Sequence, residues 1–204
     1  MMSNSRINKT ERTINKKRRR IIFIGSENAG KSSLINRFVN DRFFDGMEDT
    51  FGSSCTIYNY SIHDVELSLE LIDTSGAQRF RKIVREYYTG AHYIIAIFDL
   101  TNLSSLLLIN DEISFVRSKH PDLPIILIGT KLDLKSNVIV KESIINSVIS
   151  RHKIDKYYQI SAKSPVVGND IKIIFSAIAH DLAATEEISD TFISPDYIPV
   201  AVHF

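Results

Sequence analysis

The chain has 204 residues with a net charge of +1, of which 44% are hydrophobic and 24% charged, so it suits one domain with tails rather than two domains. This balance argues against a dedicated nucleic-acid binder, whose basic surface usually dominates the domain. One cysteine, Cys55, excludes an intramolecular disulfide, and because neither a secretory leader nor a membrane-spanning apolar run is present, we expect a cytoplasmic protein.

The first segment, residues 1–19, is polar and predicts a disordered arm that ends in the basic run Lys16–Arg20. That run has three interpretations: a solvated tail, a patch that makes weak peripheral contact with an endomembrane surface, or a nuclear address. The character of the sequence then changes abruptly. We expect one folded domain over residues 20–183 and a tail over residues 184–204.

Short apolar runs and longer amphipathic stretches alternate along this domain. The runs have the length of strands buried on both faces of a parallel sheet: Ile21–Ile24, Leu67–Ile72, Tyr93–Phe98, Ile125–Ile128 and the shorter Tyr157–Ile160. The stretches between them predict helices over Ser32–Val39, Ser104–Lys119, Lys141–His152 and Asp170–Leu182. Such alternation implies βαβ units in an α/β fold, with helices on both faces of an open sheet.

One pair of runs departs from the alternation. Only His63 and Asp64 separate Cys55–Ile62 from Val65–Ile72, which predicts an antiparallel hairpin at the edge of the sheet. The sequence therefore predicts a mostly parallel sheet of six strands with one antiparallel edge strand.

The segment from Gly25 to Ser32 matches G-x-x-x-x-G-K-[ST] between a predicted strand and a predicted helix. Its glycines let backbone N–H groups turn toward a phosphate, and the following helix N-terminus adds unpaired donors and a favourable dipole. Lys31 can reach the β and γ phosphates, and the Ser32 hydroxyl can ligate Mg²⁺. The strand–loop–helix setting argues against a chance match, so the sequence predicts a nucleotide-phosphate site.

Three further segments carry polar residues directly after predicted strands. Asp73 can hold Mg²⁺ through water, and the N–H of Gly76 can meet the γ-phosphate. Asp133 can accept the two hydrogen bonds that guanine, unlike adenine, offers from N1 and its 2-amino group. The segment Ser161–Lys163 can supply a backbone N–H for the guanine oxygen. Each signal is weak alone, but an open α/β sheet brings the carboxyl ends of its strands to one ligand site.

Together these segments resemble the five nucleotide-binding motifs of Ras superfamily small GTPases, over about Arg20 to Leu182. The resemblance implies the G domain of P-loop NTPases, with GTP or GDP as bound nucleotide and Mg²⁺. Phe43 falls where the family places an aromatic residue against the guanine ring, and Thr50, 18 residues after Ser32, matches the switch threonine. That threonine ligates Mg²⁺ and contacts the γ-phosphate only in the GTP state, so its segment is ordered by GTP and released after hydrolysis.

The resemblance therefore implies three sets of site residues. The nucleotide would be contacted by Glu27, Asn28, Ala29, Gly30, Lys31, Ser32, Ser33, Phe43, Thr50, Gly76, Thr130, Lys131, Asp133, Ser161, Ala162 and Lys163. The metal ligands would be Ser32, Thr50 and Asp73. Hydrolysis would involve Thr50, Gly76 and Gln78.

The Rab branch is the most similar one. Its first helix resembles Lys31–Phe38, and its second switch resembles Arg79–Arg81 followed by Tyr87–His92. This implies a GTP/GDP switch in vesicle trafficking or signalling. Effectors, exchange factors and activating proteins would bind through Thr50–Cys55 and Ala77–Tyr88.

Several positions depart from that pattern. Ala77 stands where the family has the glutamine that orients the attacking water, and Gln78 follows one place late. Glu27 replaces a small P-loop residue, and Thr130 replaces the commoner asparagine as it does in the Rho branch. Cys55 and Ile72 replace two members of the aromatic triad that Rab effectors contact, and the last residues contain no cysteine for prenylation.

Two functions remain open on these grounds. The first is a molecular switch with slow GTP hydrolysis, which the intact phosphate, metal and guanine residues favour. The second is a pseudo-GTPase, a nucleotide-bound interaction module without useful turnover, which Ala77 and Glu27 favour.

Overall fold

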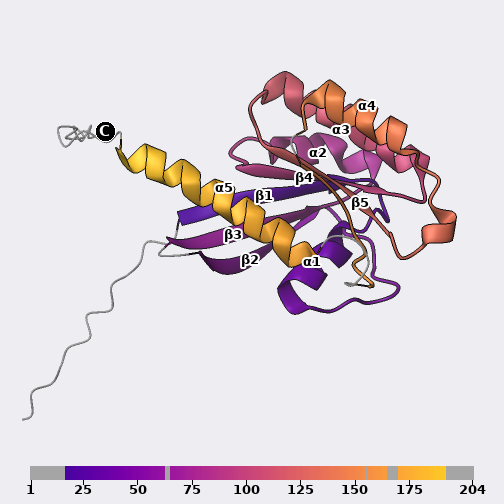
Figure 1. The fold of residues 1–204 in the computed structure, drawn as a ribbon, viewed down its shortest axis with the longest axis horizontal. Coiled ribbons are helices and arrows are strands. Elements are labelled where there is room, and N and C mark those ends of the chain that lie inside the picture. The colour runs from indigo at the N-terminus through magenta and orange to yellow at the C-terminus, as the bar shows by residue number, and fades with distance from the viewer. Residues whose placement is uncertain (1–16, 63–64, 155, 165–169, 192–204) are drawn as a thin grey trace, which may run out of the picture.

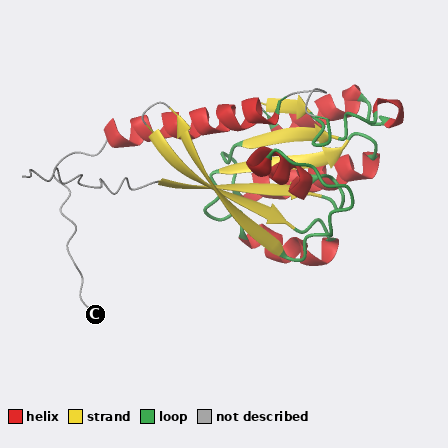
Figure 2. Cartoon of the chain, turned by 90° about the horizontal axis from the view of Figure 1, so that it is seen from below, coloured by secondary structure: helices red, strands yellow, loops and turns green. Residues whose placement is uncertain are grey.

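A computed structural model describes residues 17–62, 65–154, 156–164 and 170–191. A six-stranded sheet in the order β2-β3-β1-β4-β5-β6 carries helices on both faces (Figures 1 and 2). The strands are β1 Lys17–Gly25, β2 Ser53–Ile62, β3 Val65–Thr74, β4 Tyr93–Asp99, β5 Ile125–Thr130 and β6 Lys156–Gln159. The helices are α1 Lys31–Asn40, α2 Arg81–Glu86, α3 Leu103–Lys119, α4 Glu142–His152 and α5 Ile171–Thr191, with 3₁₀ turns η1 Gln78–Phe80 and η2 Lys135–Asn137.

The topology confirms the predicted fold class. Strand β2 pairs antiparallel with β3 at the edge of the sheet, whereas β3, β1, β4, β5 and β6 run parallel to one another. The predicted turn at His63 and Asp64 lies outside the described residues. In the parallel part, every residue of β4 and β5 is buried, as their unbroken apolar runs predict.

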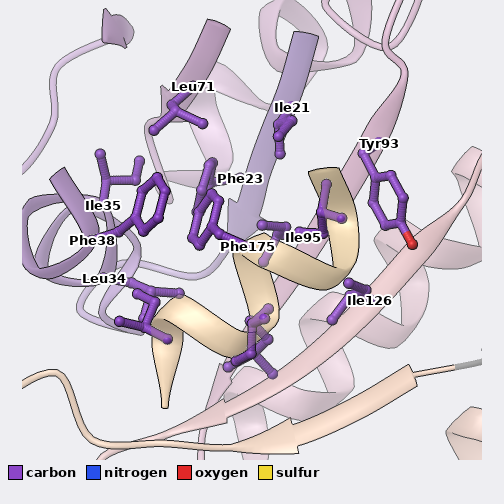
Figure 3. Packing of buried hydrophobic residues seen from close by; sticks show 14 of the residues in the cluster. Ile21, Phe23, Leu34, Ile35, Phe38, Leu71, Tyr93, Ile95, Ile126 and Phe175 are labelled. Carbon is purple, nitrogen blue, oxygen red and sulfur yellow. The ribbon is translucent and has the colours of Figure 1, made fainter. Parts of the chain in front are cut away.

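Two hydrophobic clusters hold the helices against the sheet. On one face, α1 and α5 meet the sheet around Phe38 and Phe175, whose rings stack with centroids 3.5 Å apart (Figure 3). On the other face, side chains of α2, α3 and α4 pack around residues such as Phe98 and Ile113, which are fully buried. Burying a side chain of this size contributes roughly 1.5–3 kcal/mol, so both layers are fixed firmly to the sheet.

The first strand begins earlier than its apolar run suggests. Residues 17–20 are already paired with β3, and Arg18 and Arg20 each lie 3.5 Å from the carboxylate of Glu70. The predicted disordered arm is therefore wrong for residues 17–19, because a partner strand supplies both backbone pairing and a counter-charge. Residues 1–16 lie outside the described part.

The last helix extends further than predicted. It continues to Thr191, so the expected tail is wrong for residues 184–191, where alanine and glutamate favour continued helix. Residues 192–204 lie outside the described part. Among the described helices, none has the length and apolar character needed to cross a bilayer.

Candidate functional site

A cavity of about 420 Å³ lies where β1, β3, β5 and β6 end, between the loops that follow these strands. Most of the predicted site residues line it: Glu27, Asn28, Gly30, Lys31, Ser32, Ser33, Phe43, Thr50, Gly76, Thr130, Lys131, Asp133, Ala162 and Lys163. Ala29 is buried within the loop between β1 and α1, and Asp73 and Ser161 hydrogen-bond to residues of the lining. Segments far apart in the chain thus converge on one site.

The loop after β1 wraps around the side chain of Lys31, which is 5% exposed. Its Nζ donates to the carbonyl oxygens of Gly25 at 3.0 Å and Ser26 at 2.8 Å. Burial lowers the pKa of Lys31, while the nearby carboxylates of Asp73 and Glu27 act in the opposite direction. Helix α1 begins at this lysine, so its unpaired N–H groups and a buried cation face the same space.

The backbone of this loop adopts the conformations that its residue types allow. Gly30 has φ 94° and Asn28 has φ 57°, which only glycine and a few polar residues adopt readily. A second loop presses against it, because a Cβ added to Gly76 would lie 2.2 Å from the N atom of Glu27. Only glycine therefore fits at position 76 without displacing the first loop.

Three oxygen-bearing side chains converge beneath this loop. The Ser32 hydroxyl donates to Asp73 Oδ2 at 2.5 Å, and the Thr50 hydroxyl lies 3.0 Å from both Asp73 Oδ2 and Ser32 Oγ. Asp73 Oδ1 is buried and has no hydrogen-bond partner within the part of the chain that the structure describes. Hydroxyl and carboxylate oxygens are the ligands that Mg²⁺ prefers, often with retained water, so these residues fit the predicted ion.

At the other end of the cavity, Asp133 and the segment 161–163 face each other. Ser161 Oγ donates to Asp133 Oδ1 at 2.5 Å, which orients the carboxylate at the cavity wall. Lys163 Nζ lies 5.8 Å from the centre of the Phe43 ring and pairs with Asp45 at 3.3 Å. A flat aromatic ring and a paired carboxylate suit a planar base that carries N–H donors.

Thr130 links the two ends of the cavity. Its hydroxyl lies 2.7 Å from the carbonyl oxygen of Ala29 in the first loop and 3.0 Å from that of Phe98 in β4. The next residue, Lys131, has φ 61°, and its Nζ pairs with Asp99 at 2.8 Å. We missed a role for Asp99 in the sequence, although it also ends a strand.

The loop before β2 also supplies acidic lining residues that sequence reasoning missed, namely Asp45, Glu48 and Asp49. Their density between Phe43 and Thr50 was the available signal. Ser75 is a further cavity residue that the sequence did not predict. It lines the cavity, and its N–H donates to the carbonyl oxygen of Gly52 at 2.7 Å.

The predicted catalytic residue Gln78 stands apart from the others. It is exposed at the start of η1 and is not part of the cavity lining, whereas the preceding Ala77 is 9% exposed. Glu27 is exposed and lines the cavity. A role for Gln78 in hydrolysis stays a prediction.

This arrangement joins a lysine-centred loop, a three-oxygen site and an aspartate-bearing pocket on a mixed six-stranded sheet. The Ras family model matches residues 20–184, which is most of the chain. The chain belongs to the Ras family. Its G domain is that of a small GTPase that resembles the Rabs, as the motif strings predicted.

Known proteins are about 30% identical to this chain over the residues that align with it. Human Ras-related protein Rab-36 is 31% identical over 170 residues, which is 82% of this chain and 62% of Rab-36. Human Ras-related protein Rab-7b is 29% identical over 159 residues, 76% of each chain. Human EF-hand calcium-binding domain-containing protein 4B is 34% identical over 115 residues, 56% of this chain. The chain spans only 16% of that last protein.

Proposed function

We propose that this chain is a Rab-like molecular switch that binds GTP and GDP with Mg²⁺ and hydrolyses GTP slowly. The observation that carries the proposal is the meeting of Ser32, Thr50 and Asp73 within 3.0 Å of one another, beside the buried Lys31. Thr50 belongs to the loop between α1 and β2, so its place in this cluster connects that loop to the phosphate site.

Each group has a defined task in this proposal. Lys31 and the N–H groups at the start of α1 bind the phosphates, and Gly76 brings its N–H close to the γ-phosphate. Ser32, Thr50 and Asp73 would hold Mg²⁺, which when bound neutralises phosphate charge. Phe43 and Asp133 bind the base, with Asp133 accepting the N1 and 2-amino hydrogens of guanine.

The alternative is a nucleotide-bound interaction module that does not turn over. It is favoured by Ala77, which offers no hydrogen bond to an attacking water, and by the exposed position of Gln78. Glu27 adds negative charge to the cavity wall near the phosphates. Both functions share the same nucleotide site, so binding is tested first and turnover separately.

We propose further that partners bind beside the site and that the protein acts in the cytoplasm, at an endomembrane surface. Support comes from exposed apolar side chains in the two predicted partner segments: Phe51 is 81% exposed and Ile83 is 54% exposed. Phe51 also contacts Phe80 edge-on, with ring centroids 4.9 Å apart. An effector that contacts this surface therefore touches both switch segments at once.

Calorimetric titration of nucleotide-free protein with GDP and ADP tests the binding proposal. We expect GDP to bind far more tightly than ADP and to require Mg²⁺ for full affinity. Lys31→Ala and Asp133→Ala should each weaken GDP binding by roughly a factor of 100, because each leaves charged or polar ligand groups unpaired. The exposed residues Lys119 and Asp122 provide matched controls, Lys119→Ala and Asp122→Ala, which should leave the affinity unchanged. Equal affinity for the two nucleotides would overturn the proposal.

A further inference from the structure

Arg37 connects helix α1 to the loop that follows β6. Its Nε donates to the carbonyl oxygen of Ala162 at 2.8 Å, across a sequence separation of 125 residues. Its Nη1 donates to the backbone oxygen of Asp41 at 2.9 Å and to the carboxylate of Asp41 at 3.2 Å. The side chain is 13% exposed, so three hydrogen bonds hold one guanidinium in a largely buried setting.

The accepting carbonyl belongs to the peptide group between Ala162 and Lys163. A charged donor on that carbonyl polarises the peptide and strengthens the N–H at its other end as a hydrogen-bond donor. The planar guanidinium also fixes the direction of the peptide more tightly than a lysine ammonium would. Ala162 and Lys163 both line the cavity, at the end where Ser161 orients Asp133.

Helix α1 thereby touches both ends of the cavity. Lys31 and Ser32 in its first turn face the phosphate end, and Arg37 reaches the opposite end two turns later. Because a helix is a stiff element, this contact sets the distance between the phosphate loop and the loop at residues 161–163.

We propose that Arg37 is a positioning residue for guanine recognition, which acts by holding and polarising the peptide after Ala162 toward the base oxygen. The inference rests on the proposed guanine site. Arg37 does not touch the nucleotide in this account. Its two hydrogen bonds to Asp41 stabilise the C-terminal end of α1, whereas its hydrogen bond to Ala162 positions the peptide that faces the base. Substitutions can therefore separate the stabilising role from the positioning role.

Nucleotide release is the measurement that separates them. Arg37→Met keeps an apolar stem but removes every donor, and we expect it to release GDP about tenfold faster than the wild type, the loss expected for one charge-assisted hydrogen bond. With 6-thioguanosine diphosphate, whose sulfur accepts hydrogen bonds poorly, the same substitution should change the release rate little. Asp41→Asn keeps the bond to Ala162 and should release both nucleotides at the wild-type rate. Arg37→Lys, which keeps the charge, should recover part of the loss.

The outcomes distinguish the inference from the function on which it rests. If wild-type protein does not bind GDP, the proposed function fails and the inference fails with it. If wild type binds GDP and Arg37→Met releases it at the same rate, only the inference fails. If Arg37→Met releases both nucleotides faster by the same factor, Arg37 acts through general stability and the inference is again wrong. Should Arg37→Met not fold, Arg37→Leu, which also carries no hydrogen-bond donor, gives the same comparison.

Discussion

Ala77 and Glu27 are the residues that set the phosphate end of this cavity apart from the usual small GTPase pattern. Ala77 N–H donates to Ser75 Oγ at 3.3 Å, and its methyl side chain is nearly buried, so it leaves no polar group directed at the phosphates. Glu27 lines the cavity from the first loop. Transition states of phosphoryl transfer carry negative charge on the oxygens of the transferred group. A nearby carboxylate repels this charge and raises the energy of the transition state.

We therefore expect single-turnover GTP hydrolysis to be slow in the wild type and faster in Ala77→Gln and Glu27→Gly. A gained transition-state hydrogen bond should raise the rate by roughly 10–100-fold, and the double variant should be the fastest of the series. Asp122→Ala, at an exposed position outside the cavity lining, is the control and should leave the rate unchanged. Gln78→Ala tests separately whether Gln78 takes part in hydrolysis, since its side chain is exposed outside the cavity lining. Loss of hydrolysis in Gln78→Ala would instead identify it as the catalytic glutamine in a displaced motif.

At the scale of elements, a buried carboxylate fastens α2 to α3. Glu112 is 7% exposed and accepts from Arg85 through two bonds of 2.9 and 3.1 Å. The Tyr88 hydroxyl donates to the same carboxylate at 2.9 Å, and Arg81 lies 3.4 Å from it. The hydrogen bond from Arg85 to Glu112 raises the pKa of Arg85. Helix α2 lies within the predicted partner segment Ala77–Tyr88, so these contacts hold the C-terminal half of that segment against α3.

Replacing that carboxylate should cost more stability than any surface charge. Glu112→Gln keeps the shape but leaves two guanidinium groups without a counter-charge, and we expect unfolding free energy to fall by roughly 3 kcal/mol. Urea denaturation of the GDP-bound protein measures this loss. The exposed residue Glu86 in α2 provides the control Glu86→Gln, which should change stability by less than about 0.5 kcal/mol. Similar losses in both variants would contradict the anchoring role of Glu112.

For the molecule as a whole, the basic residues of β1 gather at the end of the sheet away from the cavity. We propose that this end makes weak contact with anionic membranes, but Glu70 pairs with both Arg18 and Arg20 and offsets part of their charge. The two ion pairs thus oppose the attraction that the run Lys16–Arg20 alone would produce.

Glu70→Gln should therefore strengthen binding to vesicles that contain phosphatidylserine. Each basic residue near an anionic surface contributes about 1 kcal/mol, so releasing one charge should raise the partition coefficient roughly fivefold at low salt. The gain should vanish as salt rises, because screening shortens the range of the attraction. Vesicle sedimentation measures both effects, with Glu142→Gln in α4 as a distant control. An increase that persists at high salt would rule out an electrostatic cause.

Local patterns in the sequence were enough to predict the strands and most of the site. Apolar runs mark the buried strands. Lys31, Asp73 and Asp133 each come shortly after a strand, and the parallel topology alone brings these three positions to the same edge of the sheet. What escaped prediction depends on distant partners. The charged start of β1 resembles a tail until Glu70 is placed beside it, and nothing local connects Arg85 to Glu112 or Arg37 to Ala162.

The hydroxyl of Thr130 cannot donate fully to both of its carbonyl neighbours at the same time. Its hydroxyl carries a single hydrogen, yet the carbonyl oxygens of Ala29 and Phe98 both lie within 3.0 Å of it. The asparagine common at this position in the family carries two amide hydrogens and could serve two acceptors at the same time. Here the two carbonyl oxygens must share one hydrogen, so a stronger hydrogen bond to Ala29 in the first loop means a weaker one to Phe98 in β4. The first loop and strand β4 are thus coupled through a competition for one hydrogen, which the two amide hydrogens of asparagine would remove.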